Sequence, residues 1–486
     1  MASLVALGVL YAAAILMPDA PFAPSAVAER LIRATPGGVA TFFIEALGHW
    51  ARRLLELCGM ALAVIAGAEA LRRFRNPLGA AGVLVVVAGA ASLASPSQET
   101  SVVRVALAVL LAGGAYIAIA GAMLRTLASE EVDAGRRRVL RMGAGAALGI
   151  AAGGWVAGLV ARSLGGPDTD VDLVAPMMPA TTPEASDWPD IPGLSPEITA
   201  AADHYVVDIN LVQPSVEAEG WNLRVLGEVE RPAEYDFMSL QRSFDVVQVY
   251  SVLCCVSNEV GGDLIGNSAW GGVRLKDVLE AAGVKDEALD VVFRAADGYS
   301  DSVPLEVAMQ PSVLLAVSQN GAPLTQDHGF PCRVRIPSIY GMKNVKWVES
   351  IELTPRDYQG YWQERGWSDV ATVRTQSRID VAGENLSARS GEDTWIAGIS
   401  WAGGRGISKV EVSTDGGETW NEARLKEPIA EDAWTLWAYR WTPEGNGAVE
   451  VVCRSTDGEG RVQTDEEEPP HPAGATGYHR VAVQVT

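Results

Sequence analysis

A cysteine that ends an apolar run and begins a glycine-containing loop is the first candidate for chemistry. The run 246–255 (VVQVYSVLCC) is typical of a buried strand, and Cys255 leads from it into the loop SNEVGGD. Glycine lets the backbone approach a ligand closely, and a thiolate is a soft donor suited to a redox metal. Cysteine is also a small apolar residue that a buried strand accepts readily, and composition alone favours this simpler interpretation.

A second candidate is a concentration of basic side chains in the segment DHGFPCRVRIPSIYGMKNVKWVESIEL. Five of them fall within 19 residues, between glycines and prolines: His328, Arg333, Arg335, Lys343 and Lys346. Arginine offers bidentate donors to a phosphate, and lysine offers a point charge. The segment therefore indicates a site for an anionic cofactor with a phosphate tail. Ordinary surface charge is the alternative that the spacing leaves open.

The elements that must position these residues have the pattern of an α+β domain built from short pieces. Strand patterns cover 221–229, 246–255, 291–295, 312–317 and 333–336, and a helical pattern over 274–282 ends at Gly283. Beyond residue 375, turn signals at 415–417, 445–447 and 457–458 separate short strands, which predicts a β-sandwich. Its tryptophans are interpreted as core residues: Trp395, Trp401, Trp420, Trp434, Trp437 and Trp441.

Charge divides the 486-residue chain unevenly. The first 162 residues hold 14 Arg, no Lys and nine acidic residues, a net of +5, whereas the rest has a net of −27. Because a surface this acidic repels a nucleic acid backbone, no DNA or RNA partner is expected. The five cysteines form no CxxC or CxxCH motif, and His49 is the single histidine of the N-terminal third, so neither zinc nor haem is expected.

Apolar stretches at 2–17, 55–71, 78–95, 102–124 and 139–161 predict an all-α transmembrane region of about five helices over residues 1–162. A buried helical bundle in a soluble protein is the alternative. Arginine-rich loops at 72–75 and 125–141 favour a cytoplasmic N-terminus and an extracytoplasmic chain after residue 162, in a multi-pass protein of the cell membrane. The four arginines of the long loop 18–54 oppose this orientation, and the triple arginine at 136–138 also resembles a twin-arginine export signal. The Pro-rich segment 163–200 predicts an extended, mobile linker.

Residues 255–284, CVSNEVGGDLIGNSAWGGVRLKDVLEAAGV, resemble the metal-binding segment of the sulfite oxidase family. The segments HYVVDINLVQPSVEAEGWNLRVLGEV, DGYSDSVPLEVAM and LLAVSQNGAPLTQDHGFPCRVRIPSIYGMKNVKW are similar to the family in the family's own order. ISKVEVSTDGGETWNEARL and GYHRVAV resemble its immunoglobulin-like C-terminal domain. The resemblance implies a molybdopterin-binding catalytic domain over 201–370 and an immunoglobulin-like domain of the dimerisation type over 371–486.

The family resemblance implies one molybdopterin carrying molybdenum, with a single protein cysteine as metal ligand. That ligand maps to Cys255 and not to Cys254. The resemblance places His328 and Arg333 at the pterin and its phosphate, and Tyr205 near the pterin. The other implied cofactor contacts are Asn258, Asn344, Val345 and Lys346. An oxygen-atom-transfer enzyme for a small molecule is implied, with a homodimer and, because no haem segment is visible, a separate electron-transfer partner.

Two positions depart from the family's pattern. Animal and plant members carry an Arg-bearing loop after the ligand cysteine, where this chain has Asn258-Glu259-Val260, and a Tyr where it has Val317. Reduction of a neutral or organic S- or N-oxide is therefore an alternative to sulfite oxidation. A non-catalytic, membrane-tethered binding protein that kept the fold is another, and a transporter with a sensor domain is less favoured because its membrane part lacks paired polar residues.

Overall fold

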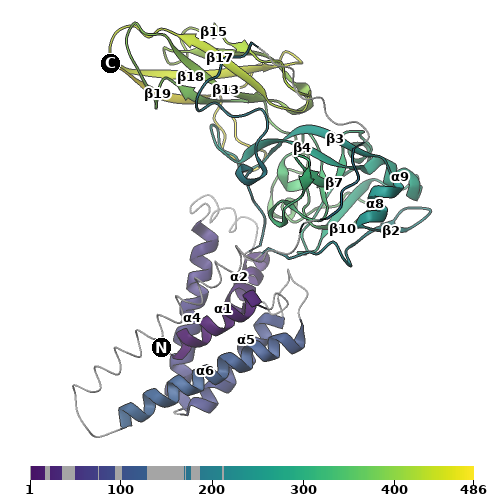
Figure 1. Cartoon of the computed structure of the whole chain (residues 1–486), viewed down its shortest axis with the longest axis vertical. Helices are drawn as coiled ribbons and strands as arrows, with labels where there is room; N and C mark the ends of the chain where they lie inside the picture. Colours follow the sequence, from purple (N-terminus) through teal and green to yellow (C-terminus); the bar gives the residue numbers. More distant parts are fainter. Residues whose placement is uncertain are drawn as a thin grey trace. The chain divides into compact units, whose positions relative to one another are not determined.

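The computed structural model describes residues 2–16, 22–35, 50–74, 76–93, 101–128, 169, 171–176, 187–210 and 213–486. The chain separates into two compact units. The first comprises residues 1–168 with the short pieces 209–215 and 296–298, and the second comprises the remainder. Both units appear in Figure 1, which follows the chain by colour.

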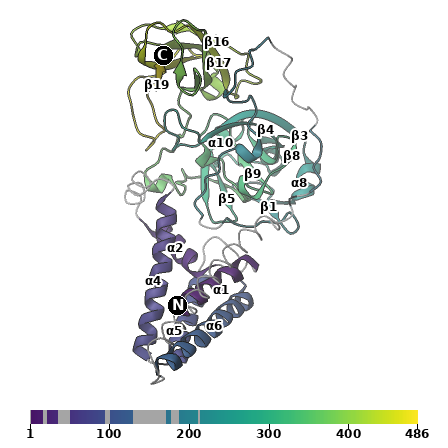
Figure 2. The ribbon, with the colours of Figure 1, turned by 60° about the vertical axis from the view of Figure 1, so that its left-hand side comes forward.

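The described part of the first unit is helical. Its helices are α1 (Ala2–Leu16), α2 (Ala23–Ala34), α4 (Trp50–Phe74), α5 (Pro77–Leu93) and α6 (Val102–Ala128). Helices α5 and α6 lie side by side, and α1 packs against α6 (Figures 1 and 2). The Tyr116 hydroxyl on α6 donates a hydrogen bond of 2.7 Å to the carbonyl of Gly67 on α4. Small residues at these crossings let the helices approach one another closely.

Four of these helices coincide with predicted apolar stretches. Helix α2 was not predicted, because Glu29, Arg30 and Arg33 interrupt its apolar residues and leave no continuous run. Among the described residues, Val102–Ala122 is the helix segment both long and apolar enough to cross a bilayer, whereas Ala2–Ala14 and Pro77–Leu93 are apolar but shorter. The fifth predicted stretch, 139–161, and the triple arginine lie outside the described residues.

The second unit contains an α+β domain, the class that the sequence predicted, and its strands form two sheets. One sheet has the order β2-β1-β10-β5-β6, and the other has the order β3-β4-β7-β8 with β9 paired to β7. The strands are β1 (Asn222–Gly227), β2 (Ala233–Asp236), β3 (Val246–Cys254), β4 (Ile265–Arg274), β5 (Asp290–Ala295), β6 (Ser300–Pro304), β7 (Leu314–Gln319), β8 (Ala322–Pro323), β9 (Arg333–Arg335) and β10 (Val348–Thr354). The helices are α8 (Phe237–Ser243), α9 (Leu275–Ala282) and α10 (Leu305–Ala308).

Local sequence explains where these elements begin and end. The Asp236 carboxylate accepts hydrogen bonds from the backbone N–H groups of Met238 and Ser239, at 2.9 and 2.7 Å, and so caps α8. Helix α9 stops at Gly283, whose φ of +74° is accessible to glycine at little cost. Strands β3 and β4 pair antiparallel up to Cys254↔Ile265, so Cys255 is the first residue beyond the ladder.

The C-terminal part is a sandwich of two sheets. They have the orders β11-β13-β17-β16 and β12-β19-β18-β14-β15. The strands are β11 (Gln376–Ala382), β12 (Ser387–Ala388), β13 (Thr394–Trp401), β14 (Ile407–Ser413), β15 (Asn421–Glu422), β16 (Arg424–Leu425), β17 (Thr435–Trp441), β18 (Gly447–Asp457) and β19 (His479–Val485). Residues of both sheets, including Ile396, Val412, Trp437 and Val451, share one core. That this sandwich is immunoglobulin-like stays a prediction.

Most of the sandwich's tryptophans are core residues, as the sequence analysis interpreted them. Trp401, Trp434, Trp437 and Trp441 are buried, whereas Trp395 and Trp420 are partly buried. The described end of the Pro-rich segment, 187–200, contains a turn at 192–193 and is held by contacts with residues far along the chain. The Thr199 N–H donates to the Asn267 carbonyl at 2.7 Å, and Glu197 pairs with Lys426 at 2.6 Å. The prediction of a mobile linker fails here, because composition does not reveal these long-range partners.

Candidate active site

Cys255 lies at the start of the loop 255–264, which joins β3 to β4. Its backbone N–H donates to the Leu264 carbonyl at 2.9 Å, and its Sγ lies 2.9 Å from the Ser257 hydroxyl. Burial raises the pKa of the Cys255 thiol, whereas the hydroxyl and backbone N–H groups of Ser257 and the N–H of Val256 lower it. The thiol is therefore held in place with hydrogen-bond donors available to a thiolate.

Asn258 follows in the same loop and is buried. Its Oδ1 accepts a hydrogen bond of 2.9 Å from the Leu264 N–H, which closes the loop. Its buried Nδ2 has no oxygen or nitrogen acceptor, and the Asn258 side chain lies close enough to the Cys254 sulfur to lower the pKa of that thiol. A buried donor without such an acceptor is unfavourable unless a ligand accepts from it.

Two buried arginines on β9 are the most unusual electrostatic feature. Arg335 is fully buried and Arg333 is nearly so, and both guanidinium groups lie over the Trp270 ring, at 5.7 and 5.2 Å from its centre. Alternation along the strand puts both on one face. Across the described residues, their guanidinium groups bond to carbonyls and to the Asn344 amide, and neither forms an ion pair with a carboxylate.

Burial lowers the pKa of Arg333 to about 10. Burial, and next the charge of Arg333, lowers that of Arg335 to about 9. The Nε atom of each is buried without a partner. The charge of Asp432 raises the pKa of Arg335 in part, but Asp432 forms no ion pair with it, and buried cations without a direct counter-ion are costly for a folded protein. The pair therefore fits a bound anion that would supply the missing negative charge.

Two histidines line the same region. The ring of His204 lies edge-on to those of Trp270 and His328, with centres 5.8 and 5.4 Å apart. Burial lowers the pKa of His204 to about 3 and that of His328 to about 4, so both are neutral near pH 7. The His328 Nε2 bonds to the Ala201 carbonyl at 2.9 Å, whereas the His204 Nε2 is buried without a partner.

Tyr205 connects the cysteine to the arginines. Burial raises the pKa of its hydroxyl well above 10, and the thiolates of Cys255 and Cys254 raise it further while Arg333 and Arg335 lower it. Tyr205 packs against the buried cluster that contains Leu253 and Trp270, and its hydroxyl and the Cys254 carbonyl both flank Gly341. The structure therefore brings Tyr205, Cys255, Arg333 and His328 into one region, although they come from four separate segments.

The predicted residues 344–346 have different roles. Asn344 is buried, and its Oδ1 accepts from Arg335 at 2.8 Å and from the Ile336 N–H at 2.7 Å, so its side chain positions Arg335. Val345 is buried, and its carbonyl accepts from the Val334 N–H at 2.8 Å. Lys346 forms an ion pair of 3.0 Å with Asp208. Its charge is already balanced by a protein carboxylate.

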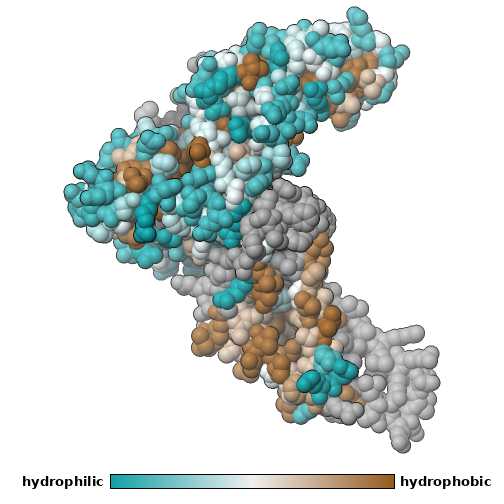
Figure 3. All heavy atoms as spheres, turned by 180° about the vertical axis from the view of Figure 1, so that it is seen from behind, coloured by the Kyte–Doolittle hydropathy of each residue, from teal (hydrophilic) through white to brown (hydrophobic). Residues whose placement is uncertain are grey.

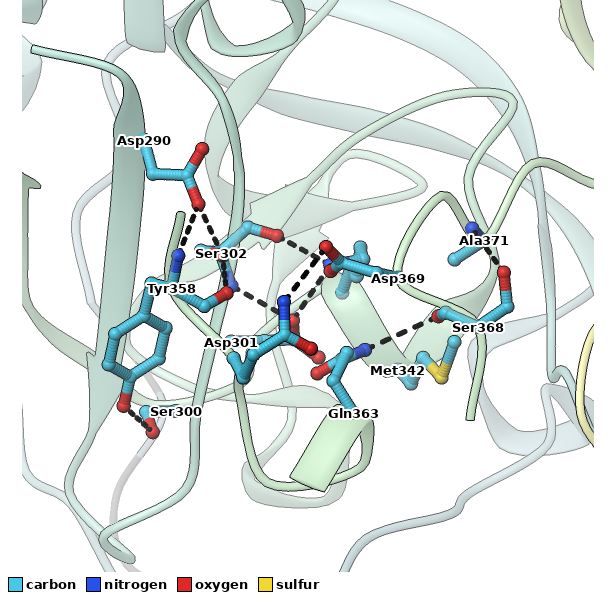
Figure 4. Close-up of polar contacts among 12 residues, drawn as sticks. Asp290, Ser300, Asp301, Ser302, Met342, Tyr358, Gln363, Ser368, Asp369 and Ala371 are labelled. Carbon is cyan, nitrogen blue, oxygen red and sulfur yellow. Dashed lines mark hydrogen bonds and ion pairs between the residues drawn. The ribbon is translucent and has the colours of Figure 1, made fainter. Parts of the chain in front are cut away.

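Lys343, counted in the basic segment, lies apart from these residues. Its Nζ donates to Asp301 at 3.0 Å, to Asp369 at 2.8 Å and to the Ser302 carbonyl at 2.8 Å. Figure 4 shows Asp301 and Asp369 directed toward this common centre. The interpretation of Lys343 as part of an anion site is therefore wrong, because two carboxylates from distant segments neutralise it.

Sequence reasoning missed three residues of the region and ranked a fourth too low. His204 directly precedes Tyr205 and is one of only five histidines in the chain, a signal that could have drawn attention to it. Trp270 and Ser257 carried no local signal. Arg335 was counted in the basic segment, but the family resemblance assigned only Arg333 to the cofactor, yet Arg335 is the more deeply buried of the two.

Comparisons with known proteins agree with this chemistry. The family "Oxidoreductase molybdopterin binding domain" matches residues 210–362, and "Mo-co oxidoreductase dimerisation domain" matches residues 368–486. Sulfite oxidase of Gallus gallus is 32% identical over 305 residues, which are 53% of this chain and 66% of that protein. Mitochondrial sulfite oxidase of Homo sapiens is 33% identical over 258 residues, covering 46% of this chain and 47% of that one. The chain thus spans about half to two thirds of the length of these relatives.

Among solved structures, the sulfane dehydrogenase SoxCD from Paracoccus pantotrophus superposes with a TM-score of 0.54. It is 21% identical and covers 65% of this chain and 93% of that one, so it supports the fold. Together these matches identify the class. The chain belongs to the sulfite oxidase family of molybdenum-dependent oxidoreductases, and its cofactor is molybdopterin with molybdenum.

The residues fit this cofactor. The Arg333–Arg335 pair has no ion-pair partner and two buried Nε atoms without acceptors, which an anionic, acceptor-rich group would satisfy, and Cys255 offers a soft donor for molybdenum. Cys254 is a poorer candidate. Burial, and next the neighbouring Cys255 thiolate, raises the pKa of Cys254 well above its usual value, and its Sγ contacts the Cys255 carbonyl.

Proposed function

We propose that this chain is a membrane-anchored, molybdenum-dependent enzyme that transfers an oxygen atom to or from a small molecule at an extracytoplasmic site. The observation that carries the catalytic part is the buried Arg333–Arg335 pair without carboxylate partners, in one region with Cys255. When bound, the molybdenum cofactor supplies the oxygen-atom transfer and the accompanying two-electron change. A non-catalytic binding protein would not need a buried thiol beside such a cation pair.

The protein's own residues have distinct tasks in this proposal. Cys255 holds the metal, and the Ser257 hydroxyl hydrogen-bonds to its sulfur and orients it. Arg333 and Arg335 bind the anionic part of the cofactor, while Asn344 fixes Arg335. His204 and His328, neutral at pH 7, give hydrogen bonds without adding charge.

The metal ligand is tested by Cys255→Ser, with Cys254→Ser as the matched control. A serine hydroxyl is a hard and mostly protonated ligand, so the Cys255 variant is expected to lose molybdenum-dependent activity while the Cys254 variant keeps most of it. Molybdenum per chain is measured in protein from a host that makes the cofactor. Wild-type protein without molybdenum would remove the enzyme proposal, and an inactive Cys254 variant beside an active Cys255 variant would reverse the ligand assignment.

A neutral S- or N-oxide as substrate, reduced at the same site, is the second candidate. The loop 255–264 contains no basic residue and presents Glu259 at its surface, and Val317 is fully buried and carries no hydroxyl. These features offer little attraction to an anion such as sulfite. A screen of sulfite and of organic S- and N-oxides with an artificial electron carrier tests this, and selective turnover of sulfite would exclude the candidate.

Membrane anchoring is supported by the surface of the first unit. Large apolar side chains on its helices face outward: Ile65 on α4 is 62% exposed, Val86 on α5 is 70% exposed and Val103 on α6 is 76% exposed. Figure 3 shows the hydrophobic surface of these helices against the mostly hydrophilic surface of the second unit. Exposed apolar area of this kind is unfavourable in water. The 21 residues of Val102–Ala122 span about 31 Å as a helix, close to the roughly 30 Å of a bilayer core.

The proposed orientation is tested with a reporter that is active outside the cytoplasm. Fused after Thr486, the reporter is expected to be active, and fused within residues 126–135 it is expected to be inactive, because arginine-rich loops stay inside. The reverse pattern would overturn the extracytoplasmic site. A separate electron-transfer protein and a homodimer through the C-terminal sandwich complete the proposal, the latter supported by the dimerisation-domain match at 368–486.

A further inference from the structure

The loop that carries Cys255 is held from outside by an arginine of the C-terminal sandwich. Arg378, on β11, donates from Nη1 to the Gly262 carbonyl at 2.8 Å. We propose that Arg378 is a positioning residue for Cys255, and that the sandwich is thereby a structural part of the metal site. This inference rests on the proposed function of Cys255 as the metal ligand.

Arg378 is itself fixed on two further sides. Its Nε donates to Asp380 Oδ1 at 2.7 Å, and its Nη2 donates to the Ser195 hydroxyl at 2.9 Å. The Ser195 N–H in turn donates to Asp380 Oδ2 at 3.1 Å, and the side chains of Arg378 and Asp380 are 14% and 6% exposed. Because Nε and Nη2 also donate to fixed partners, the guanidinium is pre-organised to present Nη1 to Gly262.

The loop transmits this restraint to Cys255 because it is closed upon itself. The Gly262 N–H donates to the Glu259 carbonyl, and the Asn258 side chain and Cys255 N–H both bond to Leu264, each at 2.9 Å. A second contact lies next to Gly262. Gly261 has a φ of +78°, and a Cβ there would collide with the His479 ring of β19. Two adjacent residues of the loop thus rest on the sandwich.

Apolar packing supports the same arrangement. Cys254 and Val256, which flank Cys255, belong to one buried cluster with Ile399, Trp401 and Trp434 of the sandwich. Both neighbours of Cys255 therefore pack against apolar residues of the sandwich. The far side of the loop is hydrogen-bonded to the sandwich through Arg378. A change in the packing of the sandwich would move the proposed metal ligand, even though no strand of the sandwich contains it.

The test is amide hydrogen exchange of residues 255–264 in the full-length chain, with Arg378→Ala, the milder Arg378→Lys and the control Arg454→Ala. Arg454 on β18 pairs with Glu411 on β14 at 2.9 Å, so its loss removes a contact that lies within the sandwich. The loop amides of the Arg378→Ala variant are expected to exchange roughly tenfold faster than in wild type, because a charge-assisted hydrogen bond is lost. The loop exchange rate of Arg378→Lys, which keeps one donor group, is expected to lie between those of wild type and Arg378→Ala.

Molybdenum per chain and the metal–thiolate absorption band are recorded on the same samples. A shifted band at unchanged molybdenum content is expected for Arg378→Ala, which a purely structural role in the sandwich would not produce. Loop exchange within twofold of wild type, or equal acceleration in Arg454→Ala, would overturn the inference while leaving the proposed function intact. Faster loop exchange in a protein that never binds molybdenum would instead retain the positioning role of Arg378 and remove the proposed function.

Discussion

Replacing Arg335 by methionine tests whether the buried guanidinium pair serves an anion. Arg335 is fully buried, and burial together with Arg333 lowers its pKa far below that of a free guanidinium, to about 9. Since one pH unit corresponds to about 1.4 kcal/mol, the interior disfavours the charged form by roughly 5 kcal/mol. The cofactor-free protein therefore carries a penalty that a bound anion would relieve.

The variant Arg335→Met removes this penalty but also removes the guanidinium donor to the carbonyls of Val252 and Ile336, whereas Asn344 Oδ1 keeps the Ile336 N–H. Each buried unsatisfied acceptor costs roughly 1–3 kcal/mol, so the two effects largely cancel. The free energy of unfolding of the cofactor-free chain is expected to change by no more than about 3 kcal/mol. Cofactor binding instead loses a charge-assisted contact of roughly 1.5–3 kcal/mol, which weakens it about ten- to a hundredfold.

Urea unfolding of cofactor-free protein and pterin content per chain are the two assays. Arg333→Met is expected to behave in the same way as Arg335→Met. Arg405→Met is the control, because Arg405 pairs with the buried Asp457 at 3.1 Å. Its loss leaves an unpaired buried carboxylate and is expected to cost roughly 3–5 kcal/mol without changing pterin per folded chain. Normal pterin content in Arg333→Met and Arg335→Met would refute the reasoning and make these cations structural.

Two further outcomes are expected. Lys343→Met leaves the buried Asp301 and the nearby Asp369 without their cation. The variant should therefore lower the free energy of unfolding by roughly 3–5 kcal/mol, while molybdenum per folded chain stays constant. A selective loss of molybdenum would show instead that Lys343 belongs to the cofactor site. His204 and His328 have pKa values of about 3 and about 4 in the folded protein, whereas a histidine in the unfolded chain has a pKa of roughly 6.5. Below that pH the unfolded chain binds more protons than the folded one, so the free energy of unfolding should decrease as the pH is lowered. Unfolding midpoints at pH 7.5, 6.5 and 5.5 measure this loss of stability, which should be smaller in His328→Phe. An equally steep pH profile in that variant would contradict the lowered pKa of His328.

The sequence by itself determined the local elements and the place of Cys255. An apolar run followed by turn residues specifies a strand and its end, and β3 stops at Cys254 as the pattern of 246–255 indicated. Gly283 ended α9 for the same reason, since helix termination depends on residues a few positions away. The family resemblance then selected Cys255, Tyr205 and His328 as one group, which periodicity could not do.

Only the tertiary structure decided which basic residues are available to an anion. Arg333, Arg335, Lys343 and Lys346 have similar local surroundings in the sequence. Lys343 meets Asp301, 42 positions away, and Lys346 meets Asp208, 138 positions away. Among the described residues neither arginine forms an ion pair, although the more distant charge of Asp432 raises the pKa of Arg335. The contact of Arg378 with Gly262 likewise joins residues 116 positions apart. Charge pairing depends on distance in space and on exclusion of water, and neither is encoded in the spacing of residues along the chain.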